Sequence, residues 1–570
     1  MEMSYMGLRD NGSSASELSE VERNAEVKEE QTSFSDDGQP EETPYTRYLV
    51  LAACTASLGG ILFGYDLGVI ASALIQLRCE FMLTDLAKEW VVTSMLVGAL
   101  VASLTGGFLI DACGRRRVIL VNSLIFICGA GVAAAAPSLA VLIVGRLILG
   151  FAISLAAISE TVYIAEIAPS DKRGRLVTLN EMGIVLGFLL AYGIGYAFVN
   201  VKNGWRFMFA ISALPAVLQG LGRLVLPASP RYLIINGQED EARKCLRQLR
   251  GIDNVEPEIA YIVRSIADEQ IVRLRDLLTC AGSAGRRLLI GGGLVFLQQM
   301  TGQPTILYYA PLIFQALGFT SHGQATLASV ILGGVKFIVA GIALRLLDTV
   351  GRRRLLLIGV MIMTVAMVLM STVITSDLTP HPQEPCPSGN SSSLPTVGPT
   401  ANTLMTVSTM AINTTVAPSV SAGRKWFSLL GLVGYISGYQ LSFGPCTWVV
   451  LTEIYPSQLR GRAVALATSL NWATNILISA VFLDLKFILG VTGLFTIYAA
   501  VCATAVIFVF LVIPETKNRT LEEISQALSA GEFKNPAQRC RSLWYSCTAP
   551  CHRRNRRRSF SSLQNEIGPS

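Results

Sequence analysis

The sequence predicts an all-α polytopic membrane protein whose twelve transmembrane helices form two six-helix halves. Of its 570 residues, 51% are hydrophobic and 15% are charged, which is too apolar for an ordinary soluble protein. The apolar runs are long enough to cross a hydrocarbon core of about 30 Å as helices. Two charged motifs occur once in each half, so we interpret the chain as one membrane unit duplicated in parallel.

The repeated motifs stand between apolar runs and place carboxylates beside arginines. The pattern E-x2-P-x3-R-G-R begins at Glu166 and again at Glu453, and D-x2-G-R-R begins at Asp111 and again at Asp348. We expect bidentate pairs between the halves to latch the cytosolic side shut and to break when it opens. The alternative is that the arginines only set the topology. The residues assigned to this cytosolic gate are Asp111, Arg115, Arg116, Glu166, Arg173, Arg175, Asp348, Arg352, Arg353, Glu453, Arg460 and Arg462.

The twelve spans are expected at about 49–75, 90–110, 118–136, 139–165, 177–199, 205–226, 288–314, 325–347, 355–375, 426–451, 464–486 and 492–513. They form an N-terminal half at 49–226 and a C-terminal half at 288–513. Lysines and arginines in the short loops gather on one side, which the positive-inside rule makes cytosolic. Both termini share that side, including a tail at 514–570, in a multi-pass protein of the plasma membrane or an endomembrane.

Polar segments precede, separate and interrupt the two halves. Residues 1–48 are acidic and poor in apolar residues, which predicts a disordered cytosolic tail. Residues 227–287 predict a small cytosolic bundle of short helices. The insert at 376–424 falls on the opposite, extracellular or lumenal side. Its sequons at Asn390 and Asn413 are therefore accessible to glycosylation, and the alternative is that they stay unoccupied.

Ionisable residues inside a bilayer are costly, so each one within a span is a candidate for function. Asp66 in the first span and Arg146 in the fourth are expected to pair. Protonation of Asp66 would then release Arg146, which outlines a proton-coupling switch. A permanent ion pair that only holds two helices together is the equal alternative. Glu181 and Lys336 are interpreted as lining a cavity or pairing with other charges, and Glu160 has no assigned role.

Polar and aromatic side chains in the second half favour a neutral polyhydroxylated substrate. Amides both donate and accept hydrogen bonds, while aromatic faces cover the C–H face of a sugar ring. Any one of these residues would also fit a role in joining helices, but the whole set fits a sugar site better. The set comprises Gln298, Gln299, Thr305, Trp448, Asn471, Trp472 and Asn475.

Over about residues 48–525 the chain resembles the sugar porter family of the major facilitator superfamily. The duplicated motifs carry this resemblance, together with Pro227-Ala-Ser-Pro-Arg231, Gln298-Gln299 and Pro514-Glu-Thr-Lys517. The chain is most similar to the class III animal facilitative glucose transporters. The resemblance implies the major facilitator fold, hexose transport by alternating access, and a sugar site at the amides and tryptophans above. It adds Glu181, which stands where the family usually has a binding glutamine.

The resemblance leaves coupling and substrate open. Asp66 is similar to the aspartate of proton-coupled xylose and myo-inositol relatives, in which it pairs with the arginine matching Arg146, so both a symporter and a facilitator are kept. Pro304 stands where the family usually has a binding asparagine, and Val295-Phe-Leu297 replaces a motif of glucose-selective members. The alternatives are transport of a polyol such as myo-inositol or of dehydroascorbate, and, as a rival class, a sugar-sensing receptor on a transporter scaffold.

The sequence shows no pattern typical of an enzyme. It has no phosphate-binding loop, no metal-ligand spacing and no nucleophile elbow. We therefore expect a protein that is not an enzyme, requires no cofactor or metal, binds no nucleic acid and works as a monomeric transport unit. Its expected partners are the sugar, the lipid bilayer and, in the symporter alternative, protons.

Overall fold

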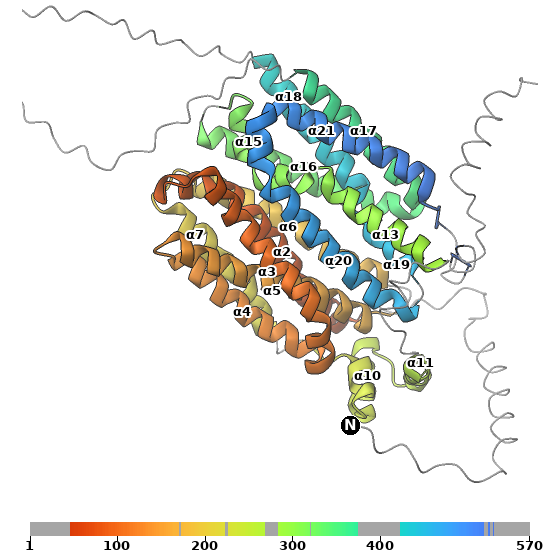
Figure 1. Cartoon of the computed structure of the whole chain (residues 1–570). Coiled ribbons are helices and arrows are strands. Elements are labelled where there is room, and N and C mark those ends of the chain that lie inside the picture. The colour runs from red at the N-terminus through yellow and green to blue at the C-terminus, as the bar shows by residue number, and fades with distance from the viewer. Residues whose placement is uncertain are drawn as a thin grey trace, which may run out of the picture. The chain divides into compact units, whose positions relative to one another are not determined.

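The computed structural model describes residues 46–169, 173–222, 226–267, 283–319, 321–373, 422–455, 457–517, 523–524 and 528. The regular elements in these residues are helices (Figure 1). The predicted all-α class is therefore confirmed.

Nine helices in the described residues are long and apolar enough to cross a membrane, and each lies at a predicted span. They are α2 (Arg47–Glu80), α3 (Asp85–Cys113), α4 (Arg115–Ala135), α5 (Leu139–Ile167), α6 (Arg173–Phe198), α16 (His322–Val350), α17 (Arg352–Val373), α20 (Ser457–Ala480) and α21 (Phe482–Val512). The chain is thus a multi-pass membrane protein.

The three remaining predicted spans are broken into shorter helices. The pieces are α7 (Gly204–Ile211) and α8 (Ala213–Leu221) at 205–226, α13 (Ser283–Met300), α14 (Gln303–Tyr308) and α15 (Ala310–Ala316) at 288–314, and α18 (Ala422–Leu441) and α19 (Phe443–Ile454) at 426–451. Helices cover the three predicted spans, but the apolar pattern did not predict the breaks within them.

Proline explains these breaks. A proline ring lacks the N–H group and clashes with the carbonyl group four residues earlier, so a helix tends to end there. The helices α7, α13 and α18 each end four residues before a proline. The end residues and their prolines are Ile211 and Pro215, Met300 and Pro304, and Leu441 and Pro445.

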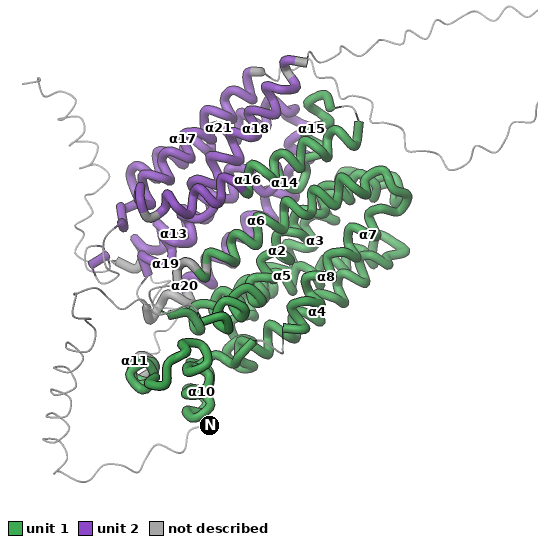
Figure 2. The backbone as a smooth tube through the Cα atoms, turned by 180° about the vertical axis from the view of Figure 1, so that it is seen from behind, with its two compact units in different colours: residues 1–270, 307–337, 382–409 green, residues 271–306, 338–381, 410–570 purple. Residues whose placement is uncertain are grey.

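The chain divides into two compact units, coloured separately in Figure 2. Unit 1 comprises residues 1–270, 307–337 and 382–409, and unit 2 comprises residues 271–306, 338–381 and 410–570. The helix α15 and the first half of α16 therefore group with unit 1. The boundaries predicted from the sequence, at 226 and 288, stay predictions.

Glycines allow the helices to pack closely within each unit. In unit 1, α2 packs along α6, and a Cβ atom built at Gly64 would lie 1.8 Å from the carbonyl oxygen of Ile184. In unit 2, α17 packs along α18, and a Cβ atom at Gly359 would lie 2.4 Å from the carbonyl oxygen of Gly438. Only glycine fits at such contacts, as is common between membrane helices.

Three short helices follow the sixth span: α9 (Pro230–Ile235), α10 (Glu239–Arg250) and α11 (Glu256–Ala267). The apolar face of α10 packs against the start of α2, where Cys245 and Leu249 join one buried cluster with Leu49. Thr46 caps α2 and also donates to the carbonyl oxygen of Leu249 at 2.7 Å. These contacts attach the short helices to unit 1.

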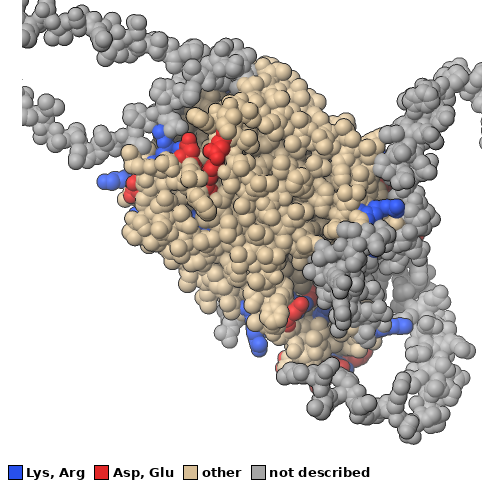
Figure 3. Space-filling view, viewed as in Figure 1, with Lys and Arg blue, Asp and Glu red and all other residues tan. Residues whose placement is uncertain are grey.

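The outer surface matches a hydrocarbon environment. In the face shown in Figure 3, Lys, Arg, Asp and Glu side chains gather towards the edges and leave the middle without visible charge. Large apolar side chains are also exposed, including Phe108 at 79% and Phe487 at 88%. A soluble protein rarely exposes such residues in number, whereas lipid tails cover them.

Candidate functional site

The two copies of D-x2-G-R-R have the same backbone geometry. Gly114 lies between α3 and α4 with a φ of 84°, and Gly351 lies between α16 and α17 with a φ of 99°. A positive φ disfavours residues with a Cβ atom, so glycine makes the tight connection possible. The connection places the next residue, Arg115 or Arg352, at the start of the following helix.

In unit 1, Arg115 joins the ends of α3 and α5. Its Nε donates to Glu166 Oε1 at 3.1 Å, and its Nη2 lies 3.2 Å from Asp111 Oδ1. Its Nη1 donates to the carbonyl oxygen of Ile110 at 3.4 Å. The hydroxyl group of Ser229, which caps α9, donates to Glu166 Oε2. The Arg115 and Glu166 side chains are 10% and 11% exposed, so water screens this pair little.

In unit 2, Arg352 repeats the arrangement. Its Nη2 lies 3.1 Å from Glu453 Oε1, and its Nη1 donates to the carbonyl oxygen of Leu347 at 3.2 Å. The main-chain N–H of Arg352 donates to Glu515 Oε1 at 3.1 Å. Arg353 Nη2 donates to the carbonyl oxygen of Phe510 at 2.7 Å. The duplication seen in the sequence is therefore also a duplication of side-chain contacts.

These ion pairs lie inside each unit, whereas we expected pairs between the halves. Each arginine pairs with the glutamate of its own unit because the helix that carries the glutamate ends beside the arginine. A latch between the halves stays a prediction. The predicted residues whose side chains lie outside the described part of the chain are Arg173, Arg175, Asp348, Asn390, Asn413, Arg460 and Arg462.

Asp66 and Arg146 are buried next to each other in unit 1. Arg146 Nη1 donates to the main-chain oxygen of Asp66 and Nε to that of Val91, both at 3.3 Å. The guanidinium carbon lies 5.9 Å from the centroid of the Phe209 ring. Both carboxyl oxygens of Asp66 are buried and accept no hydrogen bond. The two predicted residues are thus neighbours, but the guanidinium group binds the main chain of Asp66.

Glu181 and Lys336 also belong to unit 1. Lys336 in α16 is 5% exposed, and its Nζ lies 4.0 Å from the centroid of the Phe188 ring in α6. Glu181 stands about two turns before Phe188 on the same face of α6. The structure therefore brings the buried Lys336 and the half-buried Glu181 to one face of α6.

Two glutamines follow one another at the end of α13, where the seventh predicted span breaks. Gln298 Nε2 donates to the carbonyl oxygen of Phe443, the first residue of α19, at 2.9 Å. The Oε1 atoms of Gln298 and Gln299 are buried and accept no hydrogen bond. Two amide oxygens therefore remain able to accept a hydrogen bond from a ligand.

The break between α13 and α14, at residues 301–302, is stabilised by hydrogen bonds from hydroxyl groups of unit 2. Thr305 Oγ1 lies 3.0 Å from the hydroxyl oxygen of Tyr498, and the hydroxyl group of Tyr435 donates to the carbonyl oxygen of Thr301 at 3.0 Å. Gly302, with a φ of 87°, forms the turn between them. Such a break inside a membrane is tolerated because neighbouring side chains satisfy the freed backbone groups.

The other predicted sugar residues lie on α19 and α20, both of which pack against α13. Asn471, Trp472 and Asn475 are buried on α20, and Trp448 is half-buried on α19. Asn475 Oδ1 accepts a hydrogen bond from Ser479 at 3.1 Å. The whole predicted set from the second half, including Thr305 on α14, therefore belongs to unit 2.

The sequence analysis did not identify two tyrosines of unit 1 whose hydroxyl groups bind backbone carbonyl oxygens at helix breaks. The hydroxyl group of Tyr65 donates to the carbonyl oxygen of Met208 at 2.8 Å, and that of Tyr192 donates to the carbonyl oxygen of Leu307 at 2.9 Å. The Leu307 carbonyl group has no helical partner because residue 311 is a proline. The signal in the sequence was a proline inside an apolar run, which predicts a backbone carbonyl group that needs a partner from another helix.

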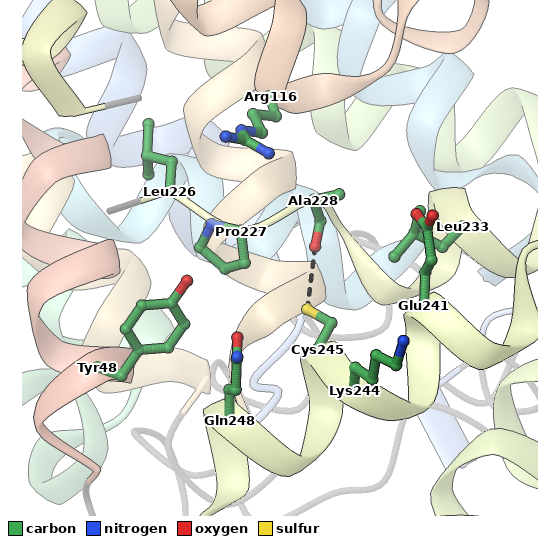
Figure 4. A pocket seen from close by; sticks show the side chains of 10 residues that line it. All are labelled: Tyr48, Arg116, Leu226, Pro227, Ala228, Leu233, Glu241, Lys244, Cys245 and Gln248. Atoms are coloured by element: carbon green, nitrogen blue, oxygen red, sulfur yellow. Dashed lines mark hydrogen bonds between the residues drawn. The ribbon is translucent and has the colours of Figure 1, made fainter. Parts of the chain in front are cut away.

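A cavity of about 300 Å³ lies where α10 meets the start of α2 (Figure 4). Tyr48, Arg116, Lys244 and Cys245 are among its lining residues. The Cys245 thiol donates to the carbonyl oxygen of Ala228 at 3.2 Å. This cavity lies in unit 1 and contains none of the predicted sugar residues.

Comparison with known proteins agrees with these observations. The family model described as "Sugar (and other) transporter" matches residues 52–420 and 393–528. The mouse solute carrier family 2 facilitated glucose transporter member 12 is 37% identical over 535 residues, which cover 85% of this chain and 86% of that protein. Member 10 of Xenopus laevis is 38% identical, covering 85% and 93%.

Solved structures extend the similarity to the fold. A partially occluded inward open conformation of the xylose transporter XylE from E. coli aligns with a TM-score of 0.66 at 25% identity, covering 83% of this chain and 100% of that one. The proton:xylose symporter XylE bound to 6-bromo-6-deoxy-D-glucose aligns with a TM-score of 0.66 at 27% identity, covering 84% and 99%. Both confirm the predicted major facilitator fold.

Proposed function

Because the chain belongs to the sugar transporter family, we propose that it carries a hexose across a membrane by alternating access between its two halves. The observation that carries this proposal is the pair of buried amide oxygens of Gln298 and Gln299, which accept no hydrogen bond beside two broken helices. A buried polar atom without a partner is costly, and a sugar hydroxyl group would satisfy it. Discontinuous helices are where transporters place their substrates.

We assign the sugar site to the polar set of unit 2. Glu181, which belongs to unit 1, is a separate proposed substrate contact that rests on the family resemblance. The amides of Gln298 and Gln299 accept sugar hydroxyl groups, and the rings of Trp448 and Trp472 cover the apolar face of the sugar. The set in unit 2 is Gln298, Gln299, Thr305, Trp448, Asn471, Trp472 and Asn475. Facilitated glucose transporters and a xylose symporter among the similar proteins support a sugar as the substrate.

Asp66 is the proposed proton site of a symporter, with Arg146 as its neighbour. The support is that both carboxyl oxygens of Asp66 are buried without a hydrogen bond, so the carboxyl group can take up a proton without losing a partner. A proton:xylose symporter among the similar structures points the same way. Facilitated transport, with the two residues in a structural role, is the competing proposal.

We propose that both termini face the cytosol, in the plasma membrane or an endomembrane. Cys79 lies at the C-terminal end of α2 and is disulfide-bonded. A disulfide supports an oxidising compartment on that side of the membrane, opposite the side of the N-terminus. The same orientation places the sequons at Asn390 and Asn413 outside. The duplicated motifs form the proposed cytosolic gate, in which Arg115–Glu166 and Arg352–Glu453 hold the helix ends of each unit.

Uptake by purified protein in lipid vesicles tests the proposed function. Radiolabelled 2-deoxyglucose should enter vesicles that contain the protein faster than protein-free vesicles, and unlabelled glucose should compete. Vesicles with Gln299→Leu should take up the sugar with a higher KM. If 2-deoxyglucose does not enter the vesicles but myo-inositol or dehydroascorbate does, the hexose assignment is wrong, and the proposal that the protein is a transporter is retained. Sugar binding without uptake of any of these solutes would favour a receptor.

A further inference from the structure

Glu160 is a fully buried carboxyl group that the proposed transport mechanism does not use. It lies in α5 with an exposed fraction of 0%, and its Oε1 accepts a hydrogen bond from Gln219 Nε2 at 2.7 Å. Its Oε2 accepts no hydrogen bond. A Cβ atom built at Gly59 of α2 would lie 1.7 Å from Oε1. The glycine therefore leaves a space in α2 that the carboxyl group fills.

The partner of Glu160 belongs to a buried network across the helices of unit 1. Gln219 comes from α8, and its Oε1 accepts a hydrogen bond from the hydroxyl group of Ser123 in α4 at 3.1 Å. Gln219 Nε2 also lies 3.4 Å from the carbonyl oxygen of Ala56 in α2. Gln219 and Ser123 are both 0% exposed. The carboxyl group is thus held in place by four helices rather than by solvent.

Among the side chains that the structure describes, the groups that face Glu160 are uncharged. From α2 they are the backbone at Ala56 and Gly59, from α8 Gln219, and from α4, through that glutamine, Ser123. Of the other helices that pack on α5, α3 contributes the apolar cluster of Ala102 and Ile110, and α6 contributes Asn180 against Gly60. The helix α9, which carries Arg231, contacts α5 at Glu166, where its cap residue Ser229 donates a hydrogen bond. The nearest charged pair along α5 is Glu166 with Arg115, about two turns further on.

A carboxylate in these surroundings would have no compensating cation among the described side chains that face it. Burying an unpaired charge costs far more than burying a neutral acid, so the group neutralises instead. A neutral carboxyl group retains one oxygen that accepts the Gln219 hydrogen bond and gains an O–H donor. The uncharged surroundings therefore favour the protonated acid over the anion.

We propose that Glu160 is a second proton-binding site, which holds its proton while enclosed as described here and gives it to water when the surrounding helices part. In that step the O–H bond breaks, the proton passes to water, and a carboxylate remains. The bound proton follows from the site alone, whereas its release rests on the proposed transport function. Gly59 precedes Asp66 by seven residues of α2, so the two proton sites lie about 10 Å apart along one helix face.

Infrared spectroscopy of the purified full chain tests the bound proton. Wild type at neutral pH should show the carbonyl stretching band of a protonated carboxylic acid, and the difference between wild type and Glu160→Gln should contain it. Glu166→Gln is the matched control, because Glu166 is paired with Arg115 and should contribute no such band. A folded Glu160→Gln protein whose spectrum retains the full band would overturn the proposal. If that variant does not fold, Gln219→Leu should shift the frequency of the band, and an unshifted band would equally overturn it.

The pH profile of uptake without a proton gradient tests the release step. Asp66→Asn removes the other proposed proton site and serves as the background. Its uptake should change as the pH rises through the range in which the exposed Glu160 carboxyl group loses its proton, and adding Glu160→Gln should remove that dependence. If the infrared band is lost but the two pH profiles coincide, Glu160 is a permanently protonated structural acid and the release step is wrong. Absence of sugar uptake in wild type would contradict the proposed function and leave the infrared result to decide on Glu160.

Discussion

Arg146 donates a hydrogen bond to the main-chain oxygen of Asp66 at 3.3 Å, while the carboxyl oxygens of Asp66 accept none. A direct ion pair would have to be broken before Asp66 could lose its negative charge to a proton. The observed arrangement avoids that cost, since the guanidinium group keeps its main-chain partners whichever state the carboxyl group adopts.

Replacement of Asp66 by Asn should therefore abolish coupling and spare folding. In vesicles with an inward proton gradient, wild type should accumulate labelled sugar above equilibrium, whereas Asp66→Asn should only equilibrate it. Asp240→Asn, on the exposed surface of α10, is the control and should accumulate sugar as wild type does. Equal uptake by wild type with and without the gradient would instead identify a facilitator.

Removal of the Arg115 side chain should destabilise the protein because it leaves Glu166 buried without its cation. Breaking a buried pair in this way costs about 3–5 kcal/mol, whereas an exposed pair contributes about 0–1 kcal/mol. We expect Arg115→Ala to lower the thermal unfolding temperature in detergent clearly, and Arg115→Met with Glu166→Gln to lower it less. The control is the exposed pair of Arg243 and Asp240, with side chains 30% and 92% exposed. Similar losses for the two pairs would refute this account of the motif.

Loss of the Tyr192 hydroxyl group should destabilise the break at Leu307. Tyr192→Phe leaves a buried carbonyl oxygen without a partner, which costs about 1–3 kcal/mol. Tyr196→Phe is the matched control, because Tyr196 stands one turn later on α6 and is 46% exposed. Chemical unfolding of both variants measures the difference, and equal stabilities would mean that water or another group satisfies the carbonyl group.

The amide of Gln299 should contribute to sugar affinity rather than to stability. Its Oε1 accepts no hydrogen bond within the protein, so Gln299→Leu removes no internal contact of that atom. One lost hydrogen bond of about 1–2 kcal/mol corresponds to a KM for uptake raised roughly 5- to 30-fold. Gln315→Leu, which removes a side chain bonded to His322, should leave the KM unchanged. A raised KM for both variants, or for neither, would contradict the assignment.

The thiol of Cys245 should resist alkylation in the folded protein. Burial raises its pKa to about 12, so at neutral pH the reactive thiolate is scarcer than at an ordinary cysteine. Maleimide labelling followed by peptide mass spectrometry should find Cys113, which is exposed at the end of α3, labelled well before Cys245. Cys245 should become reactive only when α10 detaches from α2, and its early labelling in intact protein would show that this contact opens readily.

The apolar pattern predicted nine of the spans because length and composition suffice to identify a continuous membrane helix. It also predicted the other three spans but not the breaks within them, although Pro215, Pro304 and Pro445 were visible in the sequence. Proline kinks many membrane helices without separating them, and a true break requires partners for the freed backbone. Those partners, such as Tyr435 for the carbonyl group of Thr301, come from distant helices.

The sequence by itself determined the membrane class, the duplication and the residue types at each helix end, since these follow from composition and from the spacing of charged motifs. Only the tertiary structure decided which groups meet. It paired Arg115 with Glu166 and Arg352 with Glu453 inside their own units, where we had expected pairs between the halves. It also buried Glu160 against Gln219 and the backbone of α2, where the described neighbours carry no charge. The physical reason is that a buried charge depends on its neighbours, and helix packing, rather than position along the chain, determines those neighbours.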